Sequence, residues 1–215
     1  GGGCSFYFKR RKAFAPFGPD VVPPRVLREP LLGHDLLAAN PKVRLMWVTA
    51  GNPVAMLPDS ATVARALESL EHLVVADVFL TETAQRASLV LPVPSLLEDD
   101  DLLGAYGHHY VGESRPVVDP PAGVRHEVQI FQDLARRLSL TAYPQDGIDD
   151  LKRKALAAVE GKGLSLEALR AAGGTLRSPV SPPVRFGHGR VDTDDGLVHL
   201  LDALPPPVAV EVPAP

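Results

Sequence analysis

The stretch VRLMWVTAGNP, residues 43–53, decides the fold class of this 215-residue chain. Its first seven residues are mostly apolar, β-branched or aromatic, and turn-forming residues bound the run, so it predicts a buried strand that ends in a tight loop. Asp59 and Ser60 then supply a helix cap. Apolar side chains recur at three- and four-residue spacing from Val63 to Leu70, which predicts an amphipathic helix after the loop.

Two further strands are predicted downstream of this helix. The apolar run of residues 73–76 ends at Asp77, and the run of residues 88–91 ends at Pro92. A strand, a helix and a strand in this succession are typical of a βαβ unit, whose sheet is parallel. The predicted fold class is therefore α/β, a Rossmann-like parallel sheet flanked by helices, with extended proline-rich flanks.

Ligands of such sheets bind beyond the carboxyl ends of the strands, where loops meet helix N-termini. The loops of interest are therefore residues 51–58, 77–83 and 92–109. An apolar stripe predicts a further helix over residues 125–138 that closes against the sheet. Two weaker helices are predicted over 148–159 and 165–171, and a turn between extended pieces at residues 192–196.

Composition narrows the function classes. The net charge of −4 provides no basic surface for a phosphate backbone, so we expect no nucleic-acid partner. No apolar run is long enough to span a bilayer and the first residues lack a signal-peptide pattern, which predicts a cytoplasmic protein without a membrane span, with export of a longer parent protein left open. The single cysteine, Cys4, excludes an internal disulfide and a metal site built from several cysteines of this chain.

Read together, four stretches resemble, in order and spacing, the third structural domain of the dimethyl-sulfoxide-reductase superfamily of molybdopterin oxidoreductases. They are VRLMWVTAGNPVAMLPD (43–59), HLVVADVFLTETAQRASLVLP (72–92), LLEDDDLLGAYGHHY (96–110) and PPAGVRHEVQIFQDLARRL (120–138). The acidic stretch followed by Tyr-Gly-His is most similar to the formate-dehydrogenase-like branch.

The resemblance implies a bis(molybdopterin guanine dinucleotide) cofactor with molybdenum or tungsten, of which this domain holds one guanine dinucleotide for two-electron chemistry. It also implies an iron–sulfur cluster in an N-terminal part of the parent enzyme. The expected partners are the remaining domains of that enzyme or a separately encoded subunit. The implied domains are an irregular lead-in (1–40), a dinucleotide-binding α/β domain (41–140), a helical segment (141–175) and an extended, partly disordered tail (176–215).

By position, the resemblance assigns nine residues to the cofactor. They are Gly51, Asn52, Pro53, Ala76, Asp77, Thr81, Thr83, Asp99 and Glu127. Asn52 and Asp77 match polar residues at strand ends that approach the guanine nucleotide. Asp99 replaces a lysine of some relatives, which removes a phosphate contact, and Glu127 replaces an aspartate. The hydroxyls of Thr81 and Thr83 either cap the following helix or touch a phosphate, and capping is the preferred interpretation.

No residue is predicted to ligate a metal. His108 and His109 are adjacent and point to opposite faces of an extended segment, so loop packing explains them. The acidic residues 98–101 either bind a divalent cation or form a solvated turn or inward-facing structural carboxylates, and the latter two are preferred. Ser88 stands where relatives commonly carry an aspartate.

No catalytic residue is predicted, because the metal-ligating residue, the iron–sulfur domain and the C-terminal barrel of the superfamily are not found in this sequence. We therefore expect a fragment of an oxidoreductase that is inactive by itself, with a substrate that the sequence does not identify. The alternative is a non-catalytic scaffold or binding domain with the same fold and no pterin, in a larger or split redox complex.

Overall fold

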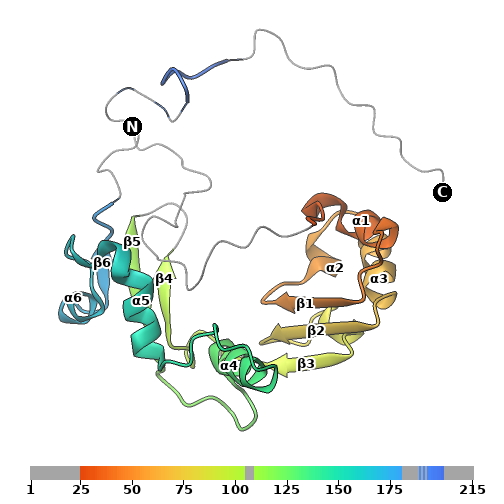
Figure 1. The fold of residues 1–215 in the computed structure, drawn as a ribbon, viewed down its shortest axis with the longest axis horizontal. Coiled ribbons are helices and arrows are strands. Elements are labelled where there is room, and N and C mark those ends of the chain that lie inside the picture. Colours follow the sequence, from red (N-terminus) through yellow and green to blue (C-terminus); the bar gives the residue numbers. More distant parts are fainter. Residues whose placement is uncertain (1–24, 105–108, 181–188, 190, 192, 201–215) are drawn as a thin grey trace. The chain divides into compact units, whose positions relative to one another are not determined.

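The computed structural model describes residues 25–104, 109–180, 189, 191 and 193–200 (Figure 1). Cys4, His108 and the proline-rich tail from Pro205 lie outside these residues. The chain divides into two units, and residues 6–181 form the one that contains the assigned helices and strands. In the other unit, the amide of Gly196 donates to the carbonyl of Thr193 (3.0 Å), which confirms the predicted turn.

The three predicted strands form a parallel sheet. β1 (Leu45–Thr49), β2 (His72–Asp77) and β3 (Leu89–Pro92) are arranged in the order β1-β2-β3. Their arrows point the same way in Figure 1. The predicted α/β class and strand direction are confirmed, and the three carboxyl ends lie along one edge of the sheet.

One face of the sheet is covered by α3 (Ser60–Glu68), the predicted amphipathic helix. Its Val63 and Leu67 pack in one buried cluster with Val48 of β1 and with side chains of β2. The predicted cap is confirmed, because the carboxylate of Asp59 accepts from the amide of Thr62 at 3.2 Å. The periodic spacing of apolar residues predicts that one side of the helix packs on the apolar strands, so this layer was predictable from the sequence.

Two short elements precede the sheet in the range that the sequence leaves irregular. They are a 3₁₀ turn, η2 (Glu29–Leu31), and the helix α1 (Leu32–Ala38). Gly33 lets α1 approach α3 closely, since an added Cβ would lie 2.8 Å from the amide nitrogen of Val63.

The helix α4 (Glu127–Arg137), the predicted helix of residues 125–138, packs against the other face of the sheet. The ring of Phe131 on α4 lies 5.1 Å from the ring of Trp47 on β1, measured between centroids. Trp47 precedes Val48 in the strand and therefore faces the side opposite α3. The helices α3 and α4 thus contact opposite faces of the sheet, and Leu45 and Leu89 on the α4 side remain exposed.

A second, antiparallel sheet was not predicted. It consists of β4 (Asp101–Gly104), β5 (Tyr110–Ser114) and β6 (Thr175–Arg177) in that order. The helices α5 (Ile148–Glu160) and α6 (Leu166–Ala171) agree with the predicted ones. Their side chains share a separate buried cluster with β5, formed by Val111, Leu156, Val159, Leu164, Leu166 and Leu169. Within the described ranges, none of the helices has the length and apolar character needed to cross a membrane.

Candidate functional site

The carboxyl edge of the parallel sheet brings the predicted loops together. The amide of Ala50, directly after β1, donates to the carbonyl of Ala76 near the end of β2 (3.0 Å). Asp77 pairs in register with Pro92, the last residue of β3, and the amide of Arg125 donates to the carbonyl of Pro92 (3.2 Å). The start of α4 therefore lies beside the strand ends. We call this edge the rim, formed by residues 50–58, 77–84, 93–100 and 125–127.

The loop after β1 is partly helical, which the sequence did not predict. A short helix, α2 (Pro53–Met56), follows Asn52 at its N-cap position. The left-handed residue of the turn is Ala50, with φ of 47°, whereas an added Cβ at Gly51 would make only ordinary contacts, the nearest at 3.5 Å from the carbonyl of Thr49. Left-handed backbone is unfavourable for alanine, so the surrounding bonds hold this turn in place.

Asn52 joins the loops after β1 and β2. Its side-chain carbonyl accepts from the amide (3.2 Å) and from the hydroxyl (2.8 Å) of Thr83, and its amide group donates to the carboxylate of Glu82 at 2.6 Å. This bond lowers the pKa of Glu82 below its ordinary value. The side chain of Asn52 thus organises the rim from within, and its contact with a nucleotide stays a prediction. Sequence reasoning missed Glu82, and its place between the two threonines was the available signal.

The hydroxyls of the two threonines accept from different elements. The hydroxyl of Thr81 accepts from the amide of Ala84 (3.2 Å), the first residue of the 3₁₀ turn η3 (Ala84–Arg86), whose N-cap residue is Thr83 and has no side-chain capping bond. The hydroxyl of Thr83 instead accepts from the amide of Val54 in α2 at 3.2 Å. For Thr83, capping of the following helix was therefore wrong, because its completely buried hydroxyl reaches the helix after the neighbouring strand.

Replacing Thr83 by valine is expected to lower the free energy of unfolding by about 1–3 kcal/mol, since it leaves buried polar groups of the rim without partners. Valine keeps the shape, so the loss reports the hydroxyl alone. Urea unfolding followed by circular dichroism measures the change. Thr141→Val, at an exposed loop position, is the matched control and should leave the midpoint unchanged. An equal shift in both variants would contradict the assigned bonds.

Asp77 and Glu127 offer hydrogen-bond acceptors at the rim. One carboxylate oxygen of Asp77 accepts from the amide of Phe79 at 3.0 Å. Glu127 is the first residue of α4, and its Oε1 is buried without a hydrogen-bond partner within the described part of the chain. An unsatisfied buried carboxylate oxygen is costly, so this atom fits a donor supplied by a ligand.

The acidic stretch of residues 98–101 makes contacts inside the protein. Asp99 lies 2.9 Å from Nδ1 of His126, the residue that precedes α4. Asp100 forms an ion pair with the ammonium group of Lys152 on α5. Among the residues with described positions, no group of three or more potential metal ligands is found. Of the alternatives for this stretch, an inward-facing structural carboxylate describes Asp100, whereas the side chain of Asp99 is 38% exposed beside His126.

Ser88, which stands where relatives commonly carry an aspartate, lies at the opposite edge of the sheet. Its hydroxyl accepts from the amide of Leu73 and donates to the carbonyl of the same residue, both at 3.0 Å. Ser88 therefore joins the starts of β2 and β3. The replacement of an aspartate by Ser88 therefore changes the charge at the amino ends of the strands and not at the rim.

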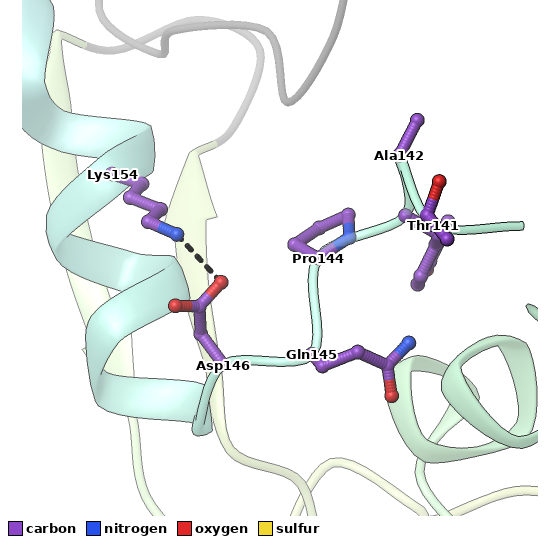
Figure 2. A pocket seen from close by; sticks show the side chains of 7 residues that line it. Thr141, Ala142, Pro144, Gln145, Asp146 and Lys154 are labelled. Carbon is purple, nitrogen blue, oxygen red and sulfur yellow. Dashed lines mark hydrogen bonds and ion pairs between the residues drawn. The ribbon is translucent and has the colours of Figure 1, made fainter. Parts of the chain in front are cut away.

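A cavity of about 530 Å³ lies in the connection between α4 and α5 (Figure 2). It is lined by residues 141–146 and by Lys154, whose ammonium group lies 2.5 Å from the carboxylate of Asp146. None of the predicted site residues lines it. We therefore place the candidate site at the rim and not in this cavity.

The sequence is similar to that of molybdopterin oxidoreductases. The sequence model of the molybdopterin oxidoreductase family matches residues 32–137. A dimethyl sulfoxide/trimethylamine N-oxide reductase from Cereibacter sphaeroides is 34% identical over 116 residues, which are 53% of this chain and 14% of that protein. The F420-dependent formate dehydrogenase subunit alpha of Methanocaldococcus jannaschii is 35% identical over 96 residues, 45% of this chain and 14% of that protein.

A solved structure has the same fold. The acetylene hydratase from Pelobacter acetylenicus matches with a TM-score of 0.57 and 23% identity, covering 68% of this chain and 20% of that one. In eight curated relatives, the chain spans between 14 and 26% of their length. Because sulfoxide reductase, nitrate reductase and formate dehydrogenase types are all among them, placement in one branch stays a prediction.

Proposed function

Residues 32–137 of this chain belong to the molybdopterin oxidoreductase family, and from this premise we propose that the rim holds the guanine end of one dinucleotide of a molybdopterin cofactor. The family implies a molybdenum or tungsten pterin cofactor. When bound, that group supplies the two-electron redox chemistry. The residues of this chain bind and orient its nucleotide end.

The observation that carries the proposal is the buried, unpartnered Oε1 of Glu127 at the rim. Guanine offers an amino group and a ring N–H as donors, and a ribose offers hydroxyls, so acceptors are the groups that such a ligand requires. Asp77, at the end of the central strand, adds a second carboxylate. The groups present therefore fit the base and sugar.

The rim fits phosphate groups poorly. Asp99 takes the place of a phosphate-pairing lysine, and its carboxylate lies against His126. Glu82 adds a further exposed carboxylate. Like charges disfavour a phosphate at this position, so we propose that the diphosphate is held by other parts of a longer protein. Those parts, including any iron–sulfur domain or separately encoded subunit, are the proposed partners.

A second candidate function is a domain of the same fold that binds no pterin and serves as a scaffold in a redox complex. The internal use of Asn52 favours this candidate, because Thr83 and Glu82 already occupy its side chain. The two candidates differ in one measurable property, which is the affinity of the rim for a guanine nucleotide.

Calorimetric titration with GDP is expected to show binding that is stronger than for ADP. Asp77→Asn is expected to weaken GDP binding about tenfold, the loss that corresponds to one charge-assisted hydrogen bond. Asp119→Asn removes the same charge at an exposed loop position and should bind GDP as the unmodified chain does. If the unmodified chain takes up neither GDP nor guanosine, which lacks the phosphates that the rim disfavours, the second candidate function replaces the first.

A further inference from the structure

A buried lysine connects the acidic stretch to the second sheet. The side chain of Lys152 on α5 is 3% exposed. Its ammonium group forms an ion pair with Asp100, lies 3.0 Å from Oε1 of Glu113 on β5, and donates to the carbonyl of Ser114 at 3.3 Å. All three donors of the ammonium group therefore have acceptors, which is the condition for burying such a charge.

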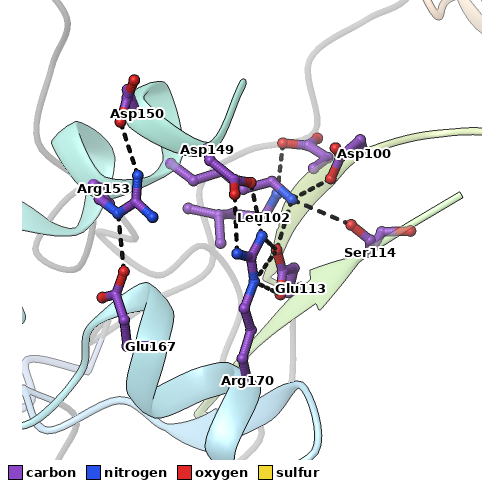
Figure 3. A network of polar contacts seen from close by, with 11 residues as sticks. Asp100, Leu102, Glu113, Ser114, Asp149, Asp150, Arg153, Glu167 and Arg170 are labelled. Atoms are coloured by element: carbon purple, nitrogen blue, oxygen red, sulfur yellow. Dashed lines mark hydrogen bonds and ion pairs between the residues drawn. The ribbon is translucent and has the colours of Figure 1, made fainter. Parts of the chain in front are cut away.

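Glu113 does not need Lys152 as a partner. Arg170 on α6 contacts both carboxylate oxygens of Glu113, at 2.7 Å and 3.0 Å, and binds Asp149 through two further bonds of 2.7 Å and 2.9 Å (Figure 3). Buried ion pairs contribute little net stability compared with apolar packing, and their best-attested use is to fix a specific arrangement. Within the described part of the chain, Asp100 forms an ion pair with Lys152 and with no other side chain.

Asp100 and its neighbour contact different helices. Asp100 pairs with Lys152 on α5, and Asp99 lies against His126 immediately before α4. The amide of Ile130 donates to the carbonyl of His126 (3.1 Å), so the position of His126 sets the first hydrogen-bonded turn of α4. The two aspartates thus connect α5 to the helix that carries Glu127.

We propose that Lys152 is a positioning residue for the rim: through Asp100 it fixes the acidic stretch, so that Asp99 holds His126 and the first turn of α4 beside the strand ends. This deepens the nucleotide-binding function proposed above, because it names what places Glu127. It assigns the second sheet and α5 a role in the geometry of a site to which they contribute no ligand-facing group.

Hydrogen exchange of the complete chain tests the proposal without a ligand. Lys152→Met is expected to speed exchange in the first turn of α4, beginning with the amide of Ile130, about tenfold. Lys154→Met is the matched control, because Lys154 lies on the same helix and, among the residues that the structure describes, pairs with the nearby Asp146 alone. It should leave exchange in α4 unchanged.

Asp99→Asn separates the links. It weakens the contacts of the Asp99 carboxylate with Nδ1 of His126 and with the amide of Asp100, and it leaves the ion pair between Asp100 and Lys152 in place, so it should speed exchange in α4 and leave α5 protected. If Lys152→Met does not fold, Asp100→Asn removes the charge of Asp100 from the same ion pair, at a side chain that is 23% exposed. Faster exchange that is confined to α5 and the second sheet in Lys152→Met or Asp100→Asn would overturn the proposal.

The same variants separate this inference from the proposed function. If the unmodified chain binds GDP, Lys152→Met is expected to weaken that binding about tenfold, as loss of one positioned carboxylate would. If the unmodified chain binds neither GDP nor guanosine, the nucleotide function fails, while the exchange result alone decides whether Lys152 positions α4.

Discussion

Replacing Glu113 by glutamine is expected to lower the free energy of unfolding at neutral pH by about 3 kcal/mol, the loss typical of removing one charge from a buried ion pair. The Glu113 side chain is 2% exposed and lies between Lys152 and Arg170. Without its negative charge, the buried ammonium group of Lys152 retains only Asp100 as an ionic partner. Urea unfolding measures the change.

Glu167→Gln is the control for this substitution. Glu167 pairs with Arg153, and both side chains are about half exposed, so water screens the pair and its loss should not move the unfolding midpoint measurably. An equal loss in the two variants would show that burial does not distinguish them, contrary to the structure.

The contribution of Glu113 should also depend on pH. Its bonds to Arg170 and to Lys152 hold the pKa of Glu113 below the ordinary value. A carboxylate with a depressed pKa in the folded state stabilises the fold above its unfolded pKa, about 4.3, and this contribution is lost as the pH falls through the lower folded pKa. The difference between the unmodified chain and Glu113→Gln should therefore be full at pH 7 and shrink on acidification below about pH 4.

Replacing Gly33 by alanine is expected to cost about 2–3 kcal/mol of unfolding free energy. The new Cβ would lie 2.8 Å from the amide nitrogen of Val63 and 2.9 Å from the carbonyl carbon of Thr62. Both are backbone atoms of α3, so α1 must move away from α3 or α3 must distort. Thermal unfolding followed by circular dichroism measures the loss.

Gly161→Ala provides the matched control for this change. Gly161 ends α5 with φ of −64°, and an added Cβ would meet nothing within 4 Å. Alanine adopts this conformation readily and restricts the unfolded chain, so this variant should be as stable as the original or slightly more stable. Similar losses at the two glycines would contradict the close approach of α1 to α3.

The parallel sheet was predictable because its signals are local. The run that contains Trp47 and Val48, and the run of residues 73–76, are apolar on both faces, as expected for strands covered by helices on both sides. The second sheet was not predictable on the same basis. β4 lies in an acidic stretch, β6 has only three residues, and β6 pairs with β5 across a long stretch of intervening chain.

The positions of the rim loops followed from the strand ends, but the bonds within the rim did not. Asn52 and Thr83 are 31 residues apart, and their contact depends on how two loops pack after the sheet has formed. A lysine in an amphipathic helix ordinarily faces solvent, so no local signal marks Lys152 as buried. Its burial results from the unpredicted sheet, which places Glu113 and Asp100 around it.

The bond between Thr83 and Val54 has a consequence for how quickly a ligand can be received. The hydrogen bond between Thr83 and Val54 joins the segment after β2 to the helix after β1. A ligand would therefore bind to one preformed surface and not to two loops that move independently. The two loops lose their conformational entropy when the chain folds and not when a ligand binds. Association should then be limited by diffusion and orientation, and residence time should differ between variants more than arrival rate.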